Sequence, residues 1–145
     1  MNVLVTGANG MVGCALCANL KNIRDGKNRT RPNISIEEIY EYDIYNSIEE
    51  LNEFCEKADF VFNLAGINRP KTNDEFMQGN FGFGETLLNI LKEKNNKAPV
   101  MLSSSIQATL IGRYGQSDYS LYLSYLPADR FKFPAICICT NIERP

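Results

Sequence analysis

Histidine and tryptophan are absent from this chain of 145 residues, and no apolar run in it is long enough to cross a membrane. Without histidine, Ser-His-Asp and Cys-His catalysis are excluded, as is any metal site with a histidine ligand. The net charge of −2 provides no basic field, which argues against a nucleic-acid partner. The apolar segment 1–20 lacks a basic start and is interrupted by glycines, so we do not expect a signal peptide.

Cysteine is present, but the count of five is odd, so the cysteines cannot all pair within the chain. With no secretory signal, reduced thiols and a cytoplasmic location are expected. Cys14 and Cys17 have the spacing of a redox pair, but they fall inside an expected helix, which favours buried packing. Cys55, Cys137 and Cys139 are too few and too scattered for a zinc site, so no metal is expected.

The spacing of apolar side chains predicts the fold class of a chain whose length indicates one domain. Strands are expected over residues 2–6, 37–43, 59–64 and 100–104, and helices over 11–20, 47–56 and 74–94. This alternation predicts an α/β fold with an incomplete doubly wound, Rossmann-like parallel sheet of about four strands. The alternation stops near Tyr114, so residues 1–117 are assigned to a nucleotide-binding domain and 118–145 to an irregular, linker-like tail.

Two further predictions concern the start of the second expected helix and the buried faces of the first and third. Ser47 and Glu50 have the spacing of a capping box at the start of the second helix. The apolar residues expected to face the core are Val12, Ala15, Leu16 and Leu20 in the first helix and Phe76, Phe83, Leu87, Leu88 and Leu91 in the third.

A glycine motif is the strongest functional signal. Gly7, Gly10 and Gly13 follow the first strand and open the first helix, which is the setting of a phosphate-binding turn. The helix N-terminus, with its free N–H groups and dipole, favours a phosphate charge there. An ordinary strand–helix turn is the alternative interpretation. The candidate cofactor-binding residues of the motif are Gly7, Asn9, Gly10, Met11, Val12 and Gly13.

The glycine spacing resembles that of the extended short-chain dehydrogenase/reductase superfamily, and further motifs follow in the expected order. The segment that ends the third expected strand resembles the motif beside the nicotinamide, which implies cofactor contacts from Leu64, Ala65 and Gly66. Asn80 resembles the structural asparagine of the family's next helix. Ser105 ends a strand as the family's catalytic serine does, and Tyr114 follows at the family's spacing, so the resemblance implies that both are catalytic.

Three longer strings narrow the resemblance. The sequences LAGINRP (64–70), SSSIQAT (103–109) and YGQS (114–117) are similar to the capsular polysaccharide biosynthesis reductases, in which a cupin domain follows the reductase domain. The resemblance implies an NADP- or NAD-dependent 4-keto reductase or epimerase that acts on a nucleotide-linked sugar.

The sequence departs from the family after the tyrosine. The family motif is Tyr-x-x-x-Lys, but the fourth residue after Tyr114 is Asp118. The lysine ammonium lowers the pKa of the tyrosine, whereas an aspartate raises it. Residues 118–134 resemble the family's reductase–cupin linker, so we expect a truncated reductase with an internal deletion that is not competent alone. The alternative is an active oxidoreductase that a partner chain completes with an ammonium group.

The sequence alone supports both NAD and NADP as the cofactor, and it leaves the oligomeric state open. An acid after the second strand favours NAD by binding ribose hydroxyls, and Glu41 and Asp43 are the candidates. The pair Asp43–Ile44 also resembles the family's contact with the adenine ring, and the resemblance favours NADP. The basic residues available for a 2′-phosphate are Arg24, Lys27, Arg29 and Arg31, although a solvated loop is the simpler interpretation. A short sheet leaves its last edge open, so we expect the tail or a second copy to cover it. The expected state is a homodimer, with a marginally stable monomer as the alternative.

Overall fold

A computed structural model of the chain describes residues 1–30, 33–67, 71–72, 77–104 and 136–139. The strands are β1 (Val3–Thr6), β2 (Ile39–Tyr42), β3 (Phe60–Asn63), β4 (Val100–Ser104) and β5 (Ile136–Cys139). The helices are α1 (Met11–Arg24), α2 (Ile48–Lys57) and α4 (Phe83–Glu93), and the π-helix η1 (Met77–Gly82) leads directly into α4.

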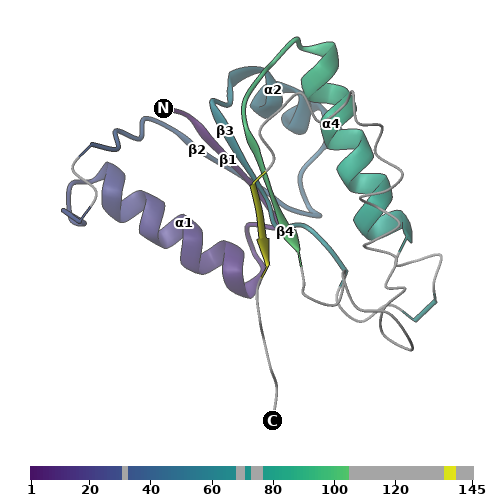
Figure 1. Cartoon of the computed structure of the whole chain (residues 1–145), viewed down its shortest axis with the longest axis horizontal. Helices are drawn as coiled ribbons and strands as arrows, with labels where there is room; N and C mark the ends of the chain where they lie inside the picture. The colour runs from purple at the N-terminus through teal and green to yellow at the C-terminus, as the bar shows by residue number, and fades with distance from the viewer. Residues whose placement is uncertain (31–32, 68–70, 73–76, 105–135, 140–145) are drawn as a thin grey trace.

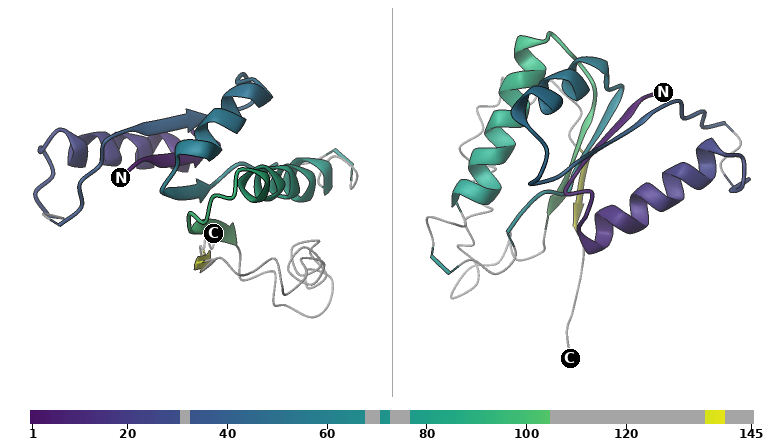
Figure 2. Two further views of the ribbon diagram at one scale, coloured as in Figure 1. Left: turned by 90° about the horizontal axis from the view of Figure 1, so that it is seen from above. Right: turned by 180° about the vertical axis from the view of Figure 1, so that it is seen from behind.

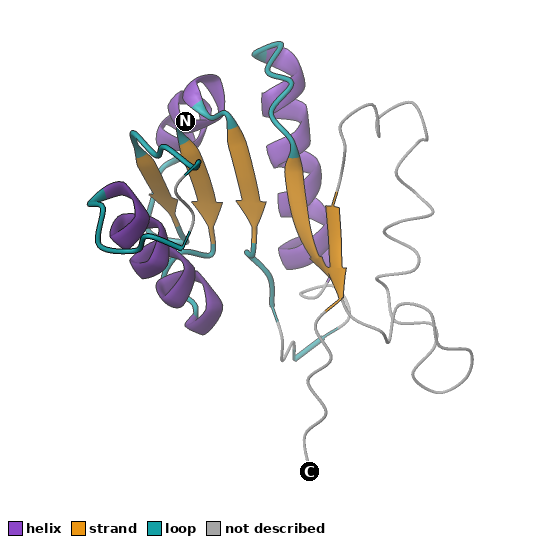
Figure 3. Ribbon diagram, turned by 60° about the vertical axis from the view of Figure 1, so that its left-hand side comes forward, coloured by secondary structure: helices purple, strands orange, loops and turns teal. Residues whose placement is uncertain are grey.

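The strands form one parallel sheet in the order β2-β1-β3-β4-β5. All five arrows point the same way in Figure 3. From β1 the chain continues to β2 on one side and then crosses back to β3 on the other side of β1. The position between β1 and β3, where the strand order reverses, is the switch point of the sheet. In doubly wound sheets this switch point is where ligands bind, at the carboxyl ends of the strands. The predicted fold class is confirmed.

The tail differs from the expectation of irregular structure. Residues 136–139 form β5, which pairs in parallel with β4 through the register Met101↔Ile136 to Ser104↔Cys139. The edge of β4 is therefore covered by the chain's own tail within the described residues. This strand was not predicted from the sequence, because it is four residues long and lies beyond the point where strand–helix alternation stops.

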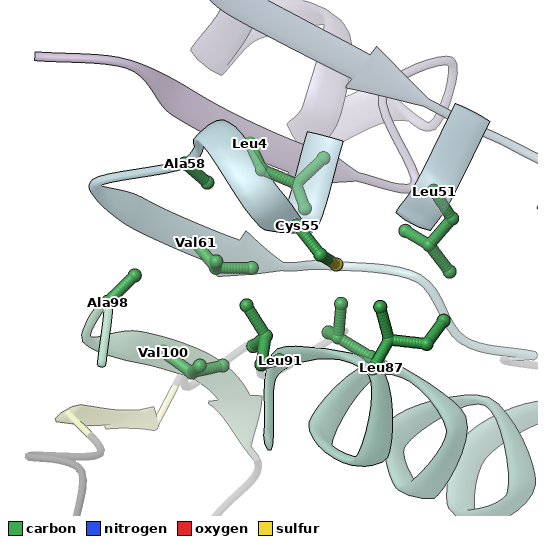
Figure 4. Packing of buried hydrophobic residues seen from close by; sticks show 10 residues of the cluster. Leu4, Leu51, Cys55, Ala58, Val61, Leu87, Leu91, Ala98 and Val100 are labelled. Atoms are coloured by element: carbon green, nitrogen blue, oxygen red, sulfur yellow. The ribbon is translucent and has the colours of Figure 1, made fainter. Parts of the chain in front are cut away.

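Helices cover the sheet on two faces, with α1 on one side and α2 and α4 on the other (Figures 1 and 2). The side chains of β1 alternate between these layers, as a buried parallel strand requires. Leu4 packs with the α2–α4 layer, whereas Val3 and Val5 pack with α1. Figure 4 shows the larger cluster, in which the fully buried Leu51 and Leu87 meet over the sheet. Strand β1 is thus anchored from both sides of the sheet.

Helix α1 is rotated relative to the prediction. Its buried residues are Gly13, Cys17 and Leu20, with Leu16 half-buried, whereas Val12 is 53% exposed. Ala15, which was expected on the buried side, is also exposed. The reason is steric, because Gly13 lies directly against the backbone of Gly7 and Ala8 and so sets which side of α1 meets the sheet.

The other two helices match the prediction more closely. The capping box at the start of α2 is confirmed, because the Ser47 side chain accepts from the Glu50 N–H and the Glu50 side chain accepts from the Ser47 N–H. In α4, Leu87 and Leu91 are buried as expected, and Phe83 and Leu88 are half-buried. The expected single helix over 74–94 instead begins, among the described residues, with the π-helical turns of η1.

Candidate dinucleotide site

The glycine turn lies at the carboxyl end of β1, beside the switch point of the sheet. Gly7 has a φ of 69°, and a Cβ there would lie 2.8 Å from the Ala65 nitrogen in the segment after β3. A Cβ on Gly13 would collide with the Gly7 carbonyl oxygen. Both positions therefore require glycine, one for its backbone conformation and one for the close approach of α1 to the turn.

The backbone donors within the turn already have partners. The N–H of Ala8 donates to the Tyr42 carbonyl (3.2 Å), and the N–H of Gly10 donates to the Gly7 carbonyl (3.0 Å). The N–H of Asn9 donates to Oδ2 of Asp43 at 2.7 Å. Asn9 was a candidate cofactor contact, but the structure uses its N–H to hold the turn against the end of β2.

The donors that remain belong to the start of α1. Met11, Val12 and Gly13 form its first turn, where a helix has no preceding carbonyls to accept from its N–H groups. Gly10 caps the helix without a side-chain hydrogen bond, and the first turn carries no acidic residue. The Met11 side chain is 82% exposed, so it leaves the approach open to a ligand. This helix start is suited to hold a phosphate group.

The segment after β3 forms the other wall of the site. The buried Thr6 hydroxyl donates to Oδ1 of Asn63 (2.7 Å) and accepts from the Ala65 N–H (3.3 Å). The Leu64 N–H donates to the Thr6 carbonyl (3.2 Å). The ends of β1 and β3 are thus joined directly at the switch point, and Leu64 and Ala65 are held facing the glycine turn. The pairing of Thr6 with Asn63 was not predicted, although both residues are polar and end apolar strands that lie side by side in the sheet.

Asn80 fixes the continuation of this segment. Its side-chain oxygen accepts from the Ile67 N–H (2.9 Å), and its side-chain nitrogen donates to the Ile67 carbonyl (3.2 Å). Gly66 lies directly beside the same amide group. One side chain from η1 therefore satisfies both backbone groups of a residue in the loop after β3. Loops at this edge of the sheet are where ligands bind in doubly wound folds.

The two acids proposed for the ribose have different surroundings. Asp43 follows β2 directly and lies next to the glycine turn, with Oδ1 accepting from the Ile44 N–H at 2.8 Å. Glu41 instead forms an ion pair with Lys21 of α1, and this hydrogen bond raises the pKa of the lysine. Ile44 is 84% exposed at the tip of the turn that follows Asp43. Only Asp43 is therefore brought to the site.

The basic residues considered for a 2′-phosphate come at or after the C-terminal end of α1 in the sequence, whereas the glycine turn precedes its N-terminal end. Arg24 ends the helix, and both Arg24 and Lys27 form ion pairs with Asp25. These two hydrogen bonds lower the pKa of Asp25. A helix of 14 residues is about 20 Å long, so these side chains are far from the glycine turn. Arg31 lies outside the described residues, as do Ser105, Tyr114 and Asp118.

Two of the three cysteines whose side chains the structure describes are buried, which argues against a reactive thiol at these two positions. Cys17 is buried, and burial raises its pKa to about 11. Burial likewise raises the pKa of Cys55 to about 12. Cys14 is exposed, which differs from the expectation that both cysteines of α1 are packed. Within the described residues, no three metal-ligating side chains come together, and no helix is long and apolar enough to span a membrane.

A parallel sheet in this order, with a glycine turn and free helix N–H groups at its switch point, defines a dinucleotide-binding domain of the Rossmann class. Comparison with family models narrows the class. Residues 3–127 match the NAD dependent epimerase/dehydratase family, and the chain belongs to that family.

Individual relatives agree with this assignment. The chain is 38% identical over 117 residues to UDP-2-acetamido-2,6-beta-L-arabino-hexul-4-ose reductase of Pseudomonas aeruginosa, covering 81% of this chain and 28% of the reductase. It also resembles the capsular polysaccharide assembling protein CapF of Staphylococcus aureus, with 32% identity and a TM-score of 0.67 over 96% of this chain and 34% of CapF. The chain thus spans about a third of these relatives.

A more distant structure shares the fold. The UDP-glucuronic acid 4-epimerase of Bacillus cereus, solved with NAD, has 17% identity and a TM-score of 0.66, covering 96% of this chain and 56% of the epimerase.

Proposed function

We propose that this chain binds a nicotinamide dinucleotide as the cofactor domain of a reductase or epimerase for a nucleotide-linked 4-keto sugar, and that it does not turn over substrate alone. The observation that carries the proposal is the glycine turn, whose own N–H groups are satisfied while those of Met11, Val12 and Gly13 at the start of α1 have no acceptor among the described residues. The reductase of Pseudomonas aeruginosa supports the substrate class, because its name gives a UDP-linked hexul-4-ose as its substrate.

Different residues of the site would bind different parts of the cofactor. The N–H groups at the start of α1 would hold the pyrophosphate, and Asp43 would accept from the adenosine ribose. Leu64, Ala65 and Gly66 would line the nicotinamide side. The bound cofactor would supply hydride transfer at the sugar carbon. Tyr114 is proposed to donate the proton to the keto oxygen, and Ser105 is proposed to hold that oxygen.

For the cofactor itself we propose NAD rather than NADP, although the family resemblance favours NADP. Asp43 places a carboxylate beside the turn, and residues 33–56 contain eight acids and no lysine or arginine. A 2′-phosphate at the adenosine ribose would add negative charge to this acidic surrounding without a base from that segment. Arg24 and Lys27 lie at the far end of α1 and are paired with Asp25.

Fluorescence titration of the full chain with NADH and with NADPH tests binding and preference together. We expect micromolar binding of NADH and roughly tenfold weaker binding of NADPH, because the Asp43 carboxylate would repel the 2′-phosphate of NADPH. Asp43→Asn should reduce the preference. Glu41→Gln is the matched control, since it removes an acid that the structure pairs with Lys21, and it should leave the preference unchanged. Failure to bind either nucleotide would contradict the proposed function.

Turnover tests the second half of the proposal. With Asp118 in place of the family's lysine, the pKa of Tyr114 is expected to rise rather than fall, so the tyrosine is a poor proton shuttle. We expect no reduction of a UDP-linked 4-keto sugar by the purified chain with NADH or NADPH. The Asp118→Lys variant should gain activity only if the substrate-binding parts are also present. Substrate turnover by the unmodified chain would overturn this part of the proposal.

A further inference from the structure

The four residues after β2 form a closed turn. The N–H of Asn46 donates to the Asp43 carbonyl at 2.9 Å. In the opposite direction, Oδ1 of Asn46 accepts from the Asp43 N–H at 2.8 Å. Asn46 therefore closes the turn twice, once with its backbone and once with its side chain. Ile44 and Tyr45 occupy the tip, which explains why their side chains are 84% and 91% exposed.

The same turn is bonded on both sides to elements that are already fixed. On one side, the Asp43 carboxylate accepts from the Asn9 N–H of the glycine turn. On the other side, Nδ2 of Asn46 donates to Oε1 of Glu50 at 3.3 Å. Glu50 is held in turn by the capping box of α2, in which its other oxygen accepts from the Ser47 N–H at 2.8 Å. A continuous set of hydrogen bonds thus runs from the cap of α2 to the glycine turn.

We infer that Asn46 is a positioning residue for dinucleotide binding, which holds the Asp43 carboxylate against the Asn9 N–H and so keeps the glycine turn in its binding conformation. The inference rests on the proposed function for its ligand. Asn46 itself contacts neither the glycine turn nor the first residues of α1 through any hydrogen bond of the described residues. It acts through Asp43.

The physical reason is preorganisation. A short glycine-containing loop has many accessible conformations, and a ligand that must order it loses affinity by the cost of that ordering. The bond from Asn9 to a carboxylate is charge-assisted, so it restrains the loop more strongly than a neutral hydrogen bond. That restraint requires Asp43 to be fixed in turn. Asn46 supplies the side-chain acceptor that fixes the backbone of Asp43 and the donor that connects the turn to α2.

The experiment uses the full chain and two readouts. NADH binding is measured by fluorescence titration, and amide hydrogen exchange is measured at Asn9 by NMR. Asn46→Ala should weaken NADH binding by about fivefold, the effect of losing one good hydrogen bond. The same variant should accelerate exchange at Asn9 while the amides of β1 keep their protection. A general loss of stability would accelerate both.

Two variants make the interpretation specific. Asn52→Ala removes a side chain of the same type from α2, where among the described residues it donates to the Ile48 carbonyl alone, and it should change neither readout. Asn46→Asp keeps an acceptor for the Asp43 N–H but places a second carboxylate beside Glu50, so its protection at Asn9 should fall between that of the unmodified chain and that of Asn46→Ala. If Asn46→Ala does not fold, Asn46→Ser takes its place, because its shorter side chain also loses the reach to Asp43.

The outcomes separate this inference from the proposed function. If NADH affinity and Asn9 exchange in Asn46→Ala stay within about twofold of the unmodified chain, the inference is wrong. If the unmodified chain binds no NADH, the proposed function fails, and the exchange rate at Asn9 still decides whether Asn46 holds the turn. Equal effects from Asn46→Ala and Asn52→Ala would also overturn the inference, because they would indicate destabilisation of α2 alone.

Discussion

Thr6 and Asn63, which end neighbouring strands in the same register position, are joined by a buried hydrogen bond of 2.7 Å. The Thr6 hydroxyl also accepts from the Ala65 N–H, so it connects β1, β3 and the segment that follows β3. This bond lies at the base of the switch point, below the glycine turn. Its loss should therefore affect both stability and the geometry of the site.

Thr6→Val is the corresponding test. Valine keeps the shape of the side chain but leaves a buried amide oxygen and a backbone N–H without their partner, which should destabilise the fold by about 1–3 kcal/mol. Urea unfolding followed by circular dichroism measures the change. Thr86→Val removes an exposed hydroxyl that bonds the Gly82 carbonyl and should have a much smaller effect. Equal effects of the two substitutions would show that the buried bond contributes little.

Gly13→Ala should be strongly destabilising, because the new Cβ would collide with the Gly7 carbonyl oxygen and with Ala8. Moving α1 away from the sheet to relieve the collision should cost about 2 kcal/mol or more and should abolish dinucleotide binding. Gly82→Ala is the matched control, since a Cβ there meets nothing within 4 Å and the backbone is helical. It should be neutral or slightly stabilising. A folded Gly13→Ala chain with unchanged melting temperature would contradict the packing described for α1.

Asn80→Ala should release the loop after β3 from η1. Both hydrogen bonds to Ile67 are lost, and two half-buried backbone groups are left to solvent or without a partner. We expect a destabilisation of about 1–3 kcal/mol. Hydrogen exchange should accelerate most at Ile67. Asn19→Ala, which removes an exposed asparagine that bonds the Ala15 carbonyl, should leave both measurements unchanged. If Ile67 exchanges at the original rate in Asn80→Ala, another contact holds the loop.

The buried thiols predict a loss of stability at alkaline pH. The pKa values of Cys17 and Cys55 are raised by burial from 9.0 to about 11 and about 12. Because the unfolded chain releases these protons at lower pH than the folded chain, their contribution is fully present below pH 9.0 and is lost as pH rises toward 12. Unfolding free energies measured between pH 8 and 11 should fall less steeply in Cys55→Ala than in the unmodified chain. An identical slope would contradict the burial of this thiol.

Reactivity provides a second check on the same thiols. In a chain carrying Cys137→Ser and Cys139→Ser, iodoacetamide at pH 8 should modify the exposed Cys14 readily and leave Cys17 and Cys55 unmodified until the chain unfolds. Mass spectrometry of the digested protein identifies the modified position.

Those parts of the fold could be predicted in which residues close together in the sequence determine the structure. Strand–helix alternation predicted β1 to β4, and the Ser47–Glu50 spacing predicted the cap of α2 because that bond lies entirely within four residues. The rotation of α1 could not be predicted from apolar spacing. It depends on the contact between Gly13 and Gly7, which exists only once the turn has formed. The β5 strand likewise depends on a partner distant in sequence.

In the candidate site, too, the local features were predicted and the contacts between residues distant in sequence were not. The glycine turn was predicted, because its residue types and its position between a strand and a helix are local features. The role of Asp43 was left open, and its hydrogen bond to Asn9 joins residues that are 34 positions apart. Asn46 was not singled out from the sequence, although its own hydrogen bonds reach no farther than Asp43 and Glu50. Its proposed role depends on the distant bond from Asn9 to Asp43.

The π-helical stretch η1 has a consequence for how the chain tolerates deletions. A π-turn contains one residue more than an α-turn, so one residue removed between Asn80 and Phe83 would allow regular α-helix to form with its backbone hydrogen bonds intact. A deletion inside a regular α-helix such as α4 would turn the preceding residues by about 100° around the helix axis, because each residue contributes that rotation. In η1 the wider π-turn takes up the missing residue, so Asn80 would keep a direction closer to its original one. The loss of a single codon would thus disturb the loop that Asn80 anchors less in η1 than in α4.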